Sequence, residues 1–295
     1  MVKVFTFVFF LVAHAWGIEN YAPFKGLIIK EGTLYVITRS FTKEARPYYL
    51  LVNTTTLKTH IETLPQKSIL TLDKRFDSTL FSRLLYKSTA LHVSGGVTHA
   101  LTSSTNAIFL TMDMCPSQKK GYEDTFLSHL SSRFGKTPIA IALSSSWVLH
   151  HEDAFETLRN NPLLDITWVN HSHTHFYDKT LKDNENFMLH HSSDIKNEIL
   201  GLEQLLIERG ITPTVFFRFP GLMANKKLMN ELKETYFLIP LGADAWIAKE
   251  ERITNGSFIL IHGNKNEPKG IEMLEEMFES LPPFFFAPIL KAFVP

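Results

Sequence analysis

The sequence predicts an α/β protein in which a β-rich N-terminal region precedes a parallel sheet with helical crossovers. From about residue 105 onward, strand-like apolar runs alternate with amphipathic helical segments, and this alternation is typical of parallel strands joined by helices. Residues 25–100 contain β-branched and aromatic runs separated by turn signals instead. The 295 residues, 44% hydrophobic and 20% charged, can bury a full core, either as one large α/β domain or as one domain plus a small partner.

The first fifteen residues have the pattern of a secretory signal. Lys3 precedes the apolar run 4–12, and Ala13-His14-Ala15 has small residues at the spacing of a cleavage site. The run is too short to span a bilayer, and a buried N-terminal strand is the alternative. We therefore expect a secreted or periplasmic protein that begins near Trp16 and has no stable membrane insertion after signal removal.

The balance of charges and the cysteine content argue against a nucleic-acid-binding protein and against a disulfide-stabilised fold. Thirty basic residues balance thirty acidic ones, so we expect no nucleic-acid partner. The single cysteine, Cys115, excludes an internal disulfide.

The region 16–104 is expected to form a β-rich accessory module or an N-terminal elaboration. Its strand-like runs cover residues 26–30, 33–38 and 48–53. No catalytic pattern appears there.

The region 105–295 is expected to contain the main domain. Strands are predicted at residues 107–112, 139–143, 165–169, 214–218, 236–242, 257–262 and 284–289. Helices are predicted at residues 124–133, 151–159, 195–209, 226–235 and 272–280. Ser193 and Asp194 are good N-cap residues for the third of these helices, and Gly210 is a stop signal at its end.

A histidine cluster follows the predicted strand 165–169. His171, His173 and His175 fall within five residues, and neutral imidazole is the commonest protein ligand for a divalent metal. A polar loop without metal is the alternative, but an alternating trio at a strand end favours a metal site.

Other polar groups follow the neighbouring strands. Asp113 ends the first predicted strand, and Arg218 ends the strand that comes after the histidines along the chain. Asp244 and Trp246 follow the fifth strand, and His262 ends the sixth. The carboxyl ends of parallel strands share one edge. A carboxylate, imidazoles and an arginine at that edge indicate metal-assisted hydrolysis.

At these positions the sequence resembles the polysaccharide deacetylases of carbohydrate esterase family 4. The resemblance covers roughly residues 105–295. The matching segments are Thr111-Met112-Asp113-Met114-Cys115-Pro116, His171-Ser172-His173-Thr174-His175, Arg218-Phe219-Pro220-Gly221, a looser Asp244-Ala245-Trp246, and Leu260-Ile261-His262. It implies a distorted (β/α) barrel that uses a divalent metal, zinc foremost with cobalt, nickel or manganese also suitable, to remove acetyl groups from sugar polymers.

The resemblance also implies a role for each site residue. His171 and His175 hold the metal, with Asp113 as the catalytic base and a further ligand to the metal. Arg218 pairs with Asp113 and keeps it ionised, although a purely structural ion pair is the alternative. His262 donates the proton to the leaving group, beside Trp246 as a wall of the site.

The first motif departs from the family pattern. Met114 stands where the family has a ligand carboxylate, and a thioether is a poor ligand for such ions. Either Asp113 moves onto the metal, or Glu123 or Asp124 replaces the carboxylate, or the metal site is weakened or lost. The neighbouring Cys115 thiolate would suit zinc, or the residue is simply buried.

Three functions remain open from the sequence. The first is a metal-dependent deacetylase that hydrolyses N-acetyl groups of a chitin-like glycan, peptidoglycan or exopolysaccharide. The second is a catalytically inactive glycan-binding protein that retains the fold. The third is an amide hydrolase that acts on a small non-sugar amide.

Overall fold

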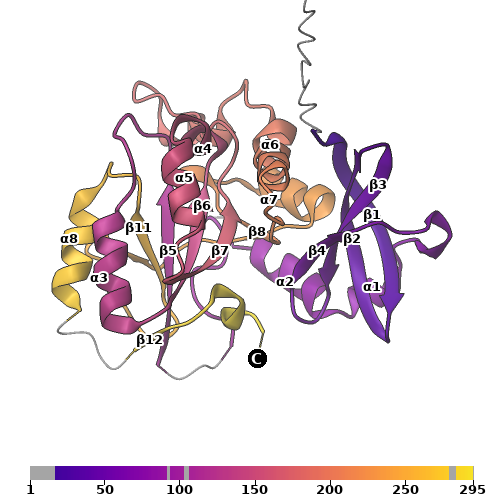
Figure 1. Ribbon diagram of the computed structural model, residues 1–295, viewed down its shortest axis with the longest axis horizontal. Coiled ribbons are helices and arrows are strands. Elements are labelled where there is room, and N and C mark those ends of the chain that lie inside the picture. Colours follow the sequence, from indigo (N-terminus) through magenta and orange to yellow (C-terminus); the bar gives the residue numbers. More distant parts are fainter. Residues whose placement is uncertain (1–16, 92–93, 103–105, 279–283, 295) are drawn as a thin grey trace, which may run out of the picture.

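The computed structural model describes residues 17–91, 94–102, 106–278 and 284–294 (Figure 1). The expected signal at residues 1–15 lies outside this part. No helix in the described ranges combines the length and the apolar character needed to cross a membrane.

The larger unit is built on a curled parallel sheet, which confirms the predicted fold class. Its central path is, in spatial order, β10 (Ala245–Trp246), β11 (Phe258–His262), β5 (Ala107–Met114), β6 (Thr137–Leu143), β7 (Leu164–Asn170), β8 (Phe216–Phe217) and β9 (Ile239–Pro240). β12 (Phe285–Phe286) pairs with β5 off this path. The register places His262 directly beside Asp113.

Helices connect these strands and cover the sheet. They are α3 (Asp124–Phe134), α4 (Ser145–His150), α5 (Glu152–Arg159), α6 (Ile195–Glu208), α7 (Lys226–Glu231) and α8 (Pro268–Met277). One core lies between the sheet and α3, α5 and α8, where Phe126 stacks on Phe278 with ring centroids 6.2 Å apart. Figure 1 shows α3 and α8 on the outer side of the parallel sheet, away from the N-terminal strands.

Short helical turns occupy several of the connections. They are the 3-10 turns Gln66–Ser68, Asp183–Glu185, Phe187–Leu189, Pro220–Leu222, Ile247–Lys249 and Ile289–Ala292, and the π-helical turn Leu232–Tyr236.

Some predicted boundaries were wrong, and the largest error concerns residues 236–242. Helix α7 continues as a π-helical turn through Tyr236, and Phe237 adopts a left-handed conformation with φ of 53°. Only Ile239–Pro240 then remain for the strand. The strands expected at 214–218 and 284–289 are likewise reduced to two residues each, and α8 begins at Pro268 rather than at residue 272.

A segment from the N-terminal region links β9, at one edge of the parallel sheet, to β11, the strand next to the other edge. Val97 forms a parallel bridge with Leu241 just beyond β9, and His99 forms an antiparallel bridge with Ser257 just before β11. Gly96 makes the approach possible, because a Cβ atom there would lie 2.3 Å from the carbonyl oxygen of Pro240.

The N-terminal region forms an antiparallel four-stranded sheet. Its strands are β1 (Glu19–Lys30), β2 (Thr33–Lys43), β3 (Arg46–Asn53) and β4 (Thr59–Glu62), in that spatial order. Two helices that the sequence analysis did not predict follow it: α1 (Lys74–Asp77) and α2 (Leu80–Thr89). The hydroxyl of Thr79 caps α2 by accepting from the backbone N–H of Ser82.

This sheet packs directly on the larger unit (Figure 1). Leu27, Val36 and Val52 share one hydrophobic cluster with Phe216 and Phe258 of the parallel sheet. The two parts of the chain therefore share a core.

A buried ion pair crosses the same boundary. Arg39 of β2 donates to both carboxylate oxygens of Glu203 in α6, at 2.6 and 2.8 Å, and both side chains are 1% exposed. The hydroxyl of Tyr21 donates to the same carboxylate at 2.8 Å, and the third guanidinium nitrogen of Arg39, Nη1, donates to the backbone carbonyl of Tyr236 at 2.7 Å.

Candidate active site

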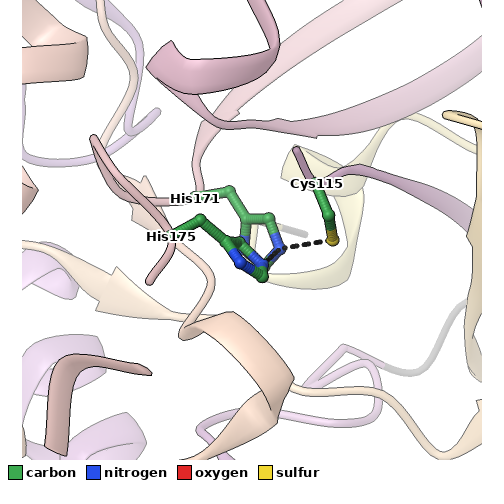
Figure 2. Close-up of side chains that lie close together, drawn as sticks. All are labelled: Cys115, His171 and His175. Carbon is green, nitrogen blue, oxygen red and sulfur yellow. Dashed lines mark hydrogen bonds between the residues drawn. The ribbon is translucent and has the colours of Figure 1, made fainter. Parts of the chain in front are cut away.

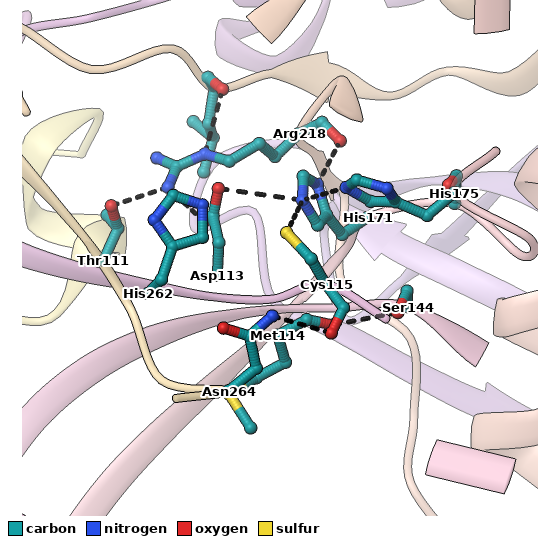
Figure 3. Close-up of polar contacts among 12 residues, drawn as sticks. Thr111, Asp113, Met114, Cys115, Ser144, His171, His175, Arg218, His262 and Asn264 are labelled. Atoms are coloured by element: carbon teal, nitrogen blue, oxygen red, sulfur yellow. Dashed lines mark hydrogen bonds and ion pairs between the residues drawn. The ribbon is translucent and has the colours of Figure 1, made fainter. Parts of the chain in front are cut away.

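Strand β5 sends alternate side chains to opposite sides of the sheet. Met112 and Met114 pack into the core beneath α3, and both are 0% exposed. Asp113 and Cys115 point the other way and line a cavity. Because β5 continues through Met114, the methionine that stands at the family's ligand position lies outside the site; Figure 3 shows it directed away from His171.

The loop after β7 carries the two histidines that line the cavity. Helix α6 holds this loop, because the Glu198 carboxylate accepts hydrogen bonds from the backbone N–H groups of His173 and Thr174 at 3.1 and 3.0 Å. Asn170 adds a contact by accepting from the N–H of Ser172 at 3.0 Å. These contacts fix the loop on both sides of the turn that brings His175 towards His171.

His173, the middle histidine of the cluster, does not line the cavity. A Cβ atom on Gly201 of α6 would lie 2.7 Å from Nδ1 of His173. The absent side chain at Gly201 therefore makes room for His173 against the helix. Two of the three clustered histidines enter the site, and the third packs on α6.

His171 is oriented as a metal ligand requires. Its Nδ1 donates to the carbonyl oxygen of Arg218 at 2.9 Å, so Nδ1 carries the proton and the Nε2 lone pair is free. That Nε2 lies 3.2 Å from Nε2 of His175 and 3.5 Å from Sγ of Cys115 (Figure 2). Among the residues described, these three form the group of donor atoms that all lie within 4.8 Å of one another. The donor set fits a divalent ion.

The electrostatics of this group favour a thiolate. Burial raises the pKa of the Cys115 thiol, but the neighbouring imidazoles, His175 foremost, lower that pKa well below its ordinary value. Thiolate is the form that binds metals and reacts.

Asp113 is held by Arg218 in an almost fully buried pair. Nη1 of Arg218 lies 2.7 Å from Oδ1 of Asp113 and also donates to the hydroxyl of Thr111 at 2.7 Å, while Nη2 donates to the carbonyl of Gly242 at 2.9 Å (Figure 3). Burial raises the pKa of Asp113, but the charges of Arg218 and His171 lower it below its ordinary value. The ion pair that the sequence analysis expected is therefore present, and it keeps the carboxylate ionised.

His262 lies beside Asp113 on the neighbouring strand and has its own carboxylate partner. Its Nδ1 lies 2.7 Å from Oε2 of Glu267, which also accepts from the indole N–H of Trp246 at 3.1 Å. Burial lowers the pKa of His262, but hydrogen bonds with Cys115 and Glu267 raise it well above the ordinary value. The Trp246 ring lies beside the imidazole, with centroids 5.7 Å apart, as expected for a wall of the site.

These groups open onto one cavity of about 540 Å³. Asp113, Cys115, His171, His175 and His262 line it. Arg218 lies behind Asp113 and is 1% exposed. Aromatic and amide side chains also line it: Tyr177, Phe187, Trp246, Asn264 and Asn266. Gly221, Leu222, Leu260 and Glu267 complete the wall.

Several sequence expectations about individual residues differ from this geometry. Glu123 and Asp124, considered as replacement ligands, lie at the start of α3 and do not belong to the donor group found among the described residues. Asp244 accepts from the backbone N–H of Phe258 and pairs with His99 at 2.7 Å, and it is not among the residues that line the cavity. Glu198 and Glu267 were not singled out by the sequence analysis; only the position of Glu267 five residues after His262 hinted at a contact.

No protein-family model matches the sequence. Solved structures of family 4 carbohydrate esterases align with the chain. A family 4 esterase from Bacillus anthracis aligns with a TM-score of 0.49 at 17% identity, over 71% of this chain and 89% of that one.

Two further solved structures align at a similar level. A chitin deacetylase from the fungal pathogen Colletotrichum lindemuthianum has a TM-score of 0.47 at 12% identity, over 66% of this chain and 90% of its own. A mutant of a family 4 pseudoenzyme with restored enzymatic activity has a TM-score of 0.47 at 13% identity, over 92% of this chain and 93% of its own.

Proposed function

We propose that this protein is a metal-dependent deacetylase that hydrolyses N-acetyl groups of a glycan. The observation that supports this most is the arrangement of Asp113, His171, His175 and His262 around a single cavity. These residues come from three different strand ends, and they combine metal-ligating, basic and acidic groups. The five motif resemblances along residues 105–295 point to the same class.

The residues of the chain divide the chemistry between them. A divalent ion, when bound by His171 and His175, supplies Lewis-acid polarisation of the acetyl carbonyl. Asp113, kept ionised by Arg218, accepts a proton from the attacking water. Contacts with Cys115 and Glu267 raise the pKa of His262 well above its ordinary value despite burial, and its Nε2 donates a proton to the departing amine nitrogen.

The cavity wall supports a sugar as the substrate. Trp246 and Phe187 line this space with aromatic rings. Asn264 and Asn266 also line it, while their amide nitrogens donate to the backbone carbonyls of Cys115 and Pro116 at 2.8 and 3.0 Å. Apolar rings with a few polar groups are the usual composition of a small-molecule site. We propose that a polymer outside the cytoplasm, such as chitin-like glycan, peptidoglycan or exopolysaccharide, is the substrate, in keeping with the export signal expected from the sequence.

The experiment combines metal analysis with acetate release. We expect purified protein to contain a divalent metal and to release acetate from N-acetylglucosamine oligomers. His171→Ala should lose metal and activity together. His262→Ala should keep its metal and lose about 10²–10⁴-fold in turnover, as for the loss of a general acid. Metal content unchanged by His171→Ala would contradict the assignment.

An inactive glycan-binding protein is the second candidate, favoured by the methionine at the ligand position of the first motif. It predicts binding of the oligomers without acetate release at any metal concentration. Acetate release from small acetamides but not from oligomers would instead indicate a non-sugar amide hydrolase.

A further inference from the structure

The only cysteine of the chain enters the candidate site. Cys115 follows β5 by one residue and lies on the same side as Asp113, two positions earlier. Its carbonyl oxygen accepts from the Asn264 amide at 2.8 Å, which fixes the backbone at this position (Figure 3). The thiol is thereby directed towards the two imidazoles, and Figure 2 shows all three donor atoms converging on one point.

Two of the donor spacings match a tetrahedral thiolate site, and all three donor atoms lie within 4.8 Å of one another. Zinc–nitrogen bonds of about 2.0–2.1 Å and zinc–sulfur bonds of about 2.3 Å, at tetrahedral angles, place two nitrogens about 3.3 Å apart and a nitrogen and a sulfur about 3.6 Å apart. The corresponding distances are 3.2 Å between the Nε2 atoms of His171 and His175, and 3.5 Å from Nε2 of His171 to Sγ of Cys115.

Asp113 is bonded to Arg218 and does not belong to the compact group of donor atoms. Its Oδ1 is held by Arg218 at 2.7 Å, and its Oδ2 lies 3.7 Å from Nε2 of His171. In the part of the chain that the structure describes, the compact donor group contains the cysteine and the two histidines but not this carboxylate. Asp113 is thus placed beside a bound ion, where a base is needed, rather than among its closest ligands.

We propose that Cys115 is the third protein ligand of the metal, in place of the carboxylate that the first motif lacks, and that the site is therefore selective for thiophilic ions. This inference rests on the proposed function only in requiring that His171 and His175 bind a metal. Thiolate favours zinc and cobalt over manganese and magnesium, which prefer oxygen ligands. With Cys115 as the third ligand, Asp113 is free to act as the base, and one position on a tetrahedral ion stays open.

Cobalt substitution tests the inference without reference to activity. Because Cys115 is the only cysteine, any thiolate-to-cobalt charge-transfer band in the near ultraviolet must arise from it. Titration of metal-free protein with Co²⁺ should produce that band together with the visible bands of tetrahedral cobalt. Manganese added in excess should not displace the cobalt.

Variants locate the third ligand. Cys115→Ser should lose the near-ultraviolet band and weaken cobalt binding by at least about tenfold. Asp113→Asn should keep the band, and so should the buried control Met114→Leu. The wild-type titration is informative even if a variant fails to fold.

The outcomes separate the inference from the proposed function. Tetrahedral cobalt bands without the charge-transfer band would overturn Cys115 as a ligand while leaving the metal dependence intact. Loss of cobalt binding in Asp113→Asn, with the band unaffected by Cys115→Ser, would assign the third position to the carboxylate. Failure of the wild-type protein to bind cobalt or zinc would overturn both.

Discussion

The carboxylate partner of His262 is the clearest addition that the structure makes at the scale of single residues. Glu267 lies 2.7 Å from Nδ1 of His262 and holds the ring with Nε2 towards the cavity. A carboxylate in this position orients an imidazole and stabilises its protonated form. Glu267 is therefore a positioning residue for the proposed proton donor.

Glu267→Gln should change the pH dependence of turnover. The hydrogen bond with Glu267 is one of the contacts that raise the pKa of His262 against the lowering effect of burial. Removing the negative charge lowers that pKa, so His262 loses its proton at a lower pH and the alkaline limb of the kcat profile moves to lower pH. Trp246→Phe, which removes the other hydrogen bond to Glu267, serves as the control and should move the limb less. An identical alkaline limb in Glu267→Gln would show that this carboxylate does not act through His262.

At the scale of elements, helix α6 determines the shape of the histidine loop. Glu198 is 6% exposed and accepts three hydrogen bonds from this loop, two from backbone N–H groups and one from the hydroxyl of Thr174. Ser172 and His175 have positive φ values of 74° and 51°. A loop with two such residues depends on outside contacts to stay in place.

Glu198→Ala should weaken metal binding although the residue does not reach the metal site. Partners that orient the ligands of a metal typically contribute about 10–100-fold in affinity, and we expect a loss of that size in competition titrations with a zinc chelator. Glu208→Ala, an exposed position on the same helix, is the matched control and should bind zinc as the wild type does. Equal affinities in both variants would mean that the loop holds its shape without α6.

The sequence predicted this site unevenly, for reasons that lie in particular elements. Five site residues could be found because each lies at or just beyond the end of a strand, and strand ends share an edge: Asp113, His171, His175, Arg218 and His262. The directions of the Met114 and Cys115 side chains could not be predicted, because they depend on β5 ending at Met114 rather than at residue 112. Glu267 was missed because its contact depends on the course of the loop after β11.

The error at residues 236–242 has a similar origin. The apolar run there has the composition of a strand, but α7 extends through a π-helical turn and Phe237 turns the chain with a left-handed conformation. Local composition gives no sign of either feature. The helices α1 and α2 were likewise hidden within a region dominated by strand signals.

At the scale of the whole molecule, the N-terminal sheet is part of the structure that supports the site. Arg39, Glu203 and Tyr21 join β1 and β2 to α6, and the same helix holds the histidine loop through Glu198. The sequence analysis expected an accessory module or an N-terminal elaboration. Either interpretation stays a prediction, and the shared hydrophobic clusters and this buried network could not be read from local composition.

Breaking the buried pair should destabilise the whole protein. Arg39→Met leaves the carboxylate of Glu203 buried without its cation, which typically costs about 3–5 kcal/mol. We expect this loss in the free energy of unfolding measured with urea, and recovery of most of it in the double variant with Glu203→Leu. Lys30→Met breaks the more exposed pair with Glu62 at 2.6 Å in the same sheet and should change the free energy by about 1 kcal/mol or less. Similar effects of the two single variants would contradict a structural role for the buried pair.

The most direct measurement of the metal-site claim is anomalous diffraction at the zinc absorption edge from crystals grown with zinc. We predict one strong peak in the cavity, with Nε2 of His171, Nε2 of His175 and Sγ of Cys115 within about 2.0–2.4 Å of it. Asp113 should remain paired with Arg218, outside that distance. A peak at another place, or the absence of any peak in this cavity at saturating zinc, would contradict the proposed metal-dependent site.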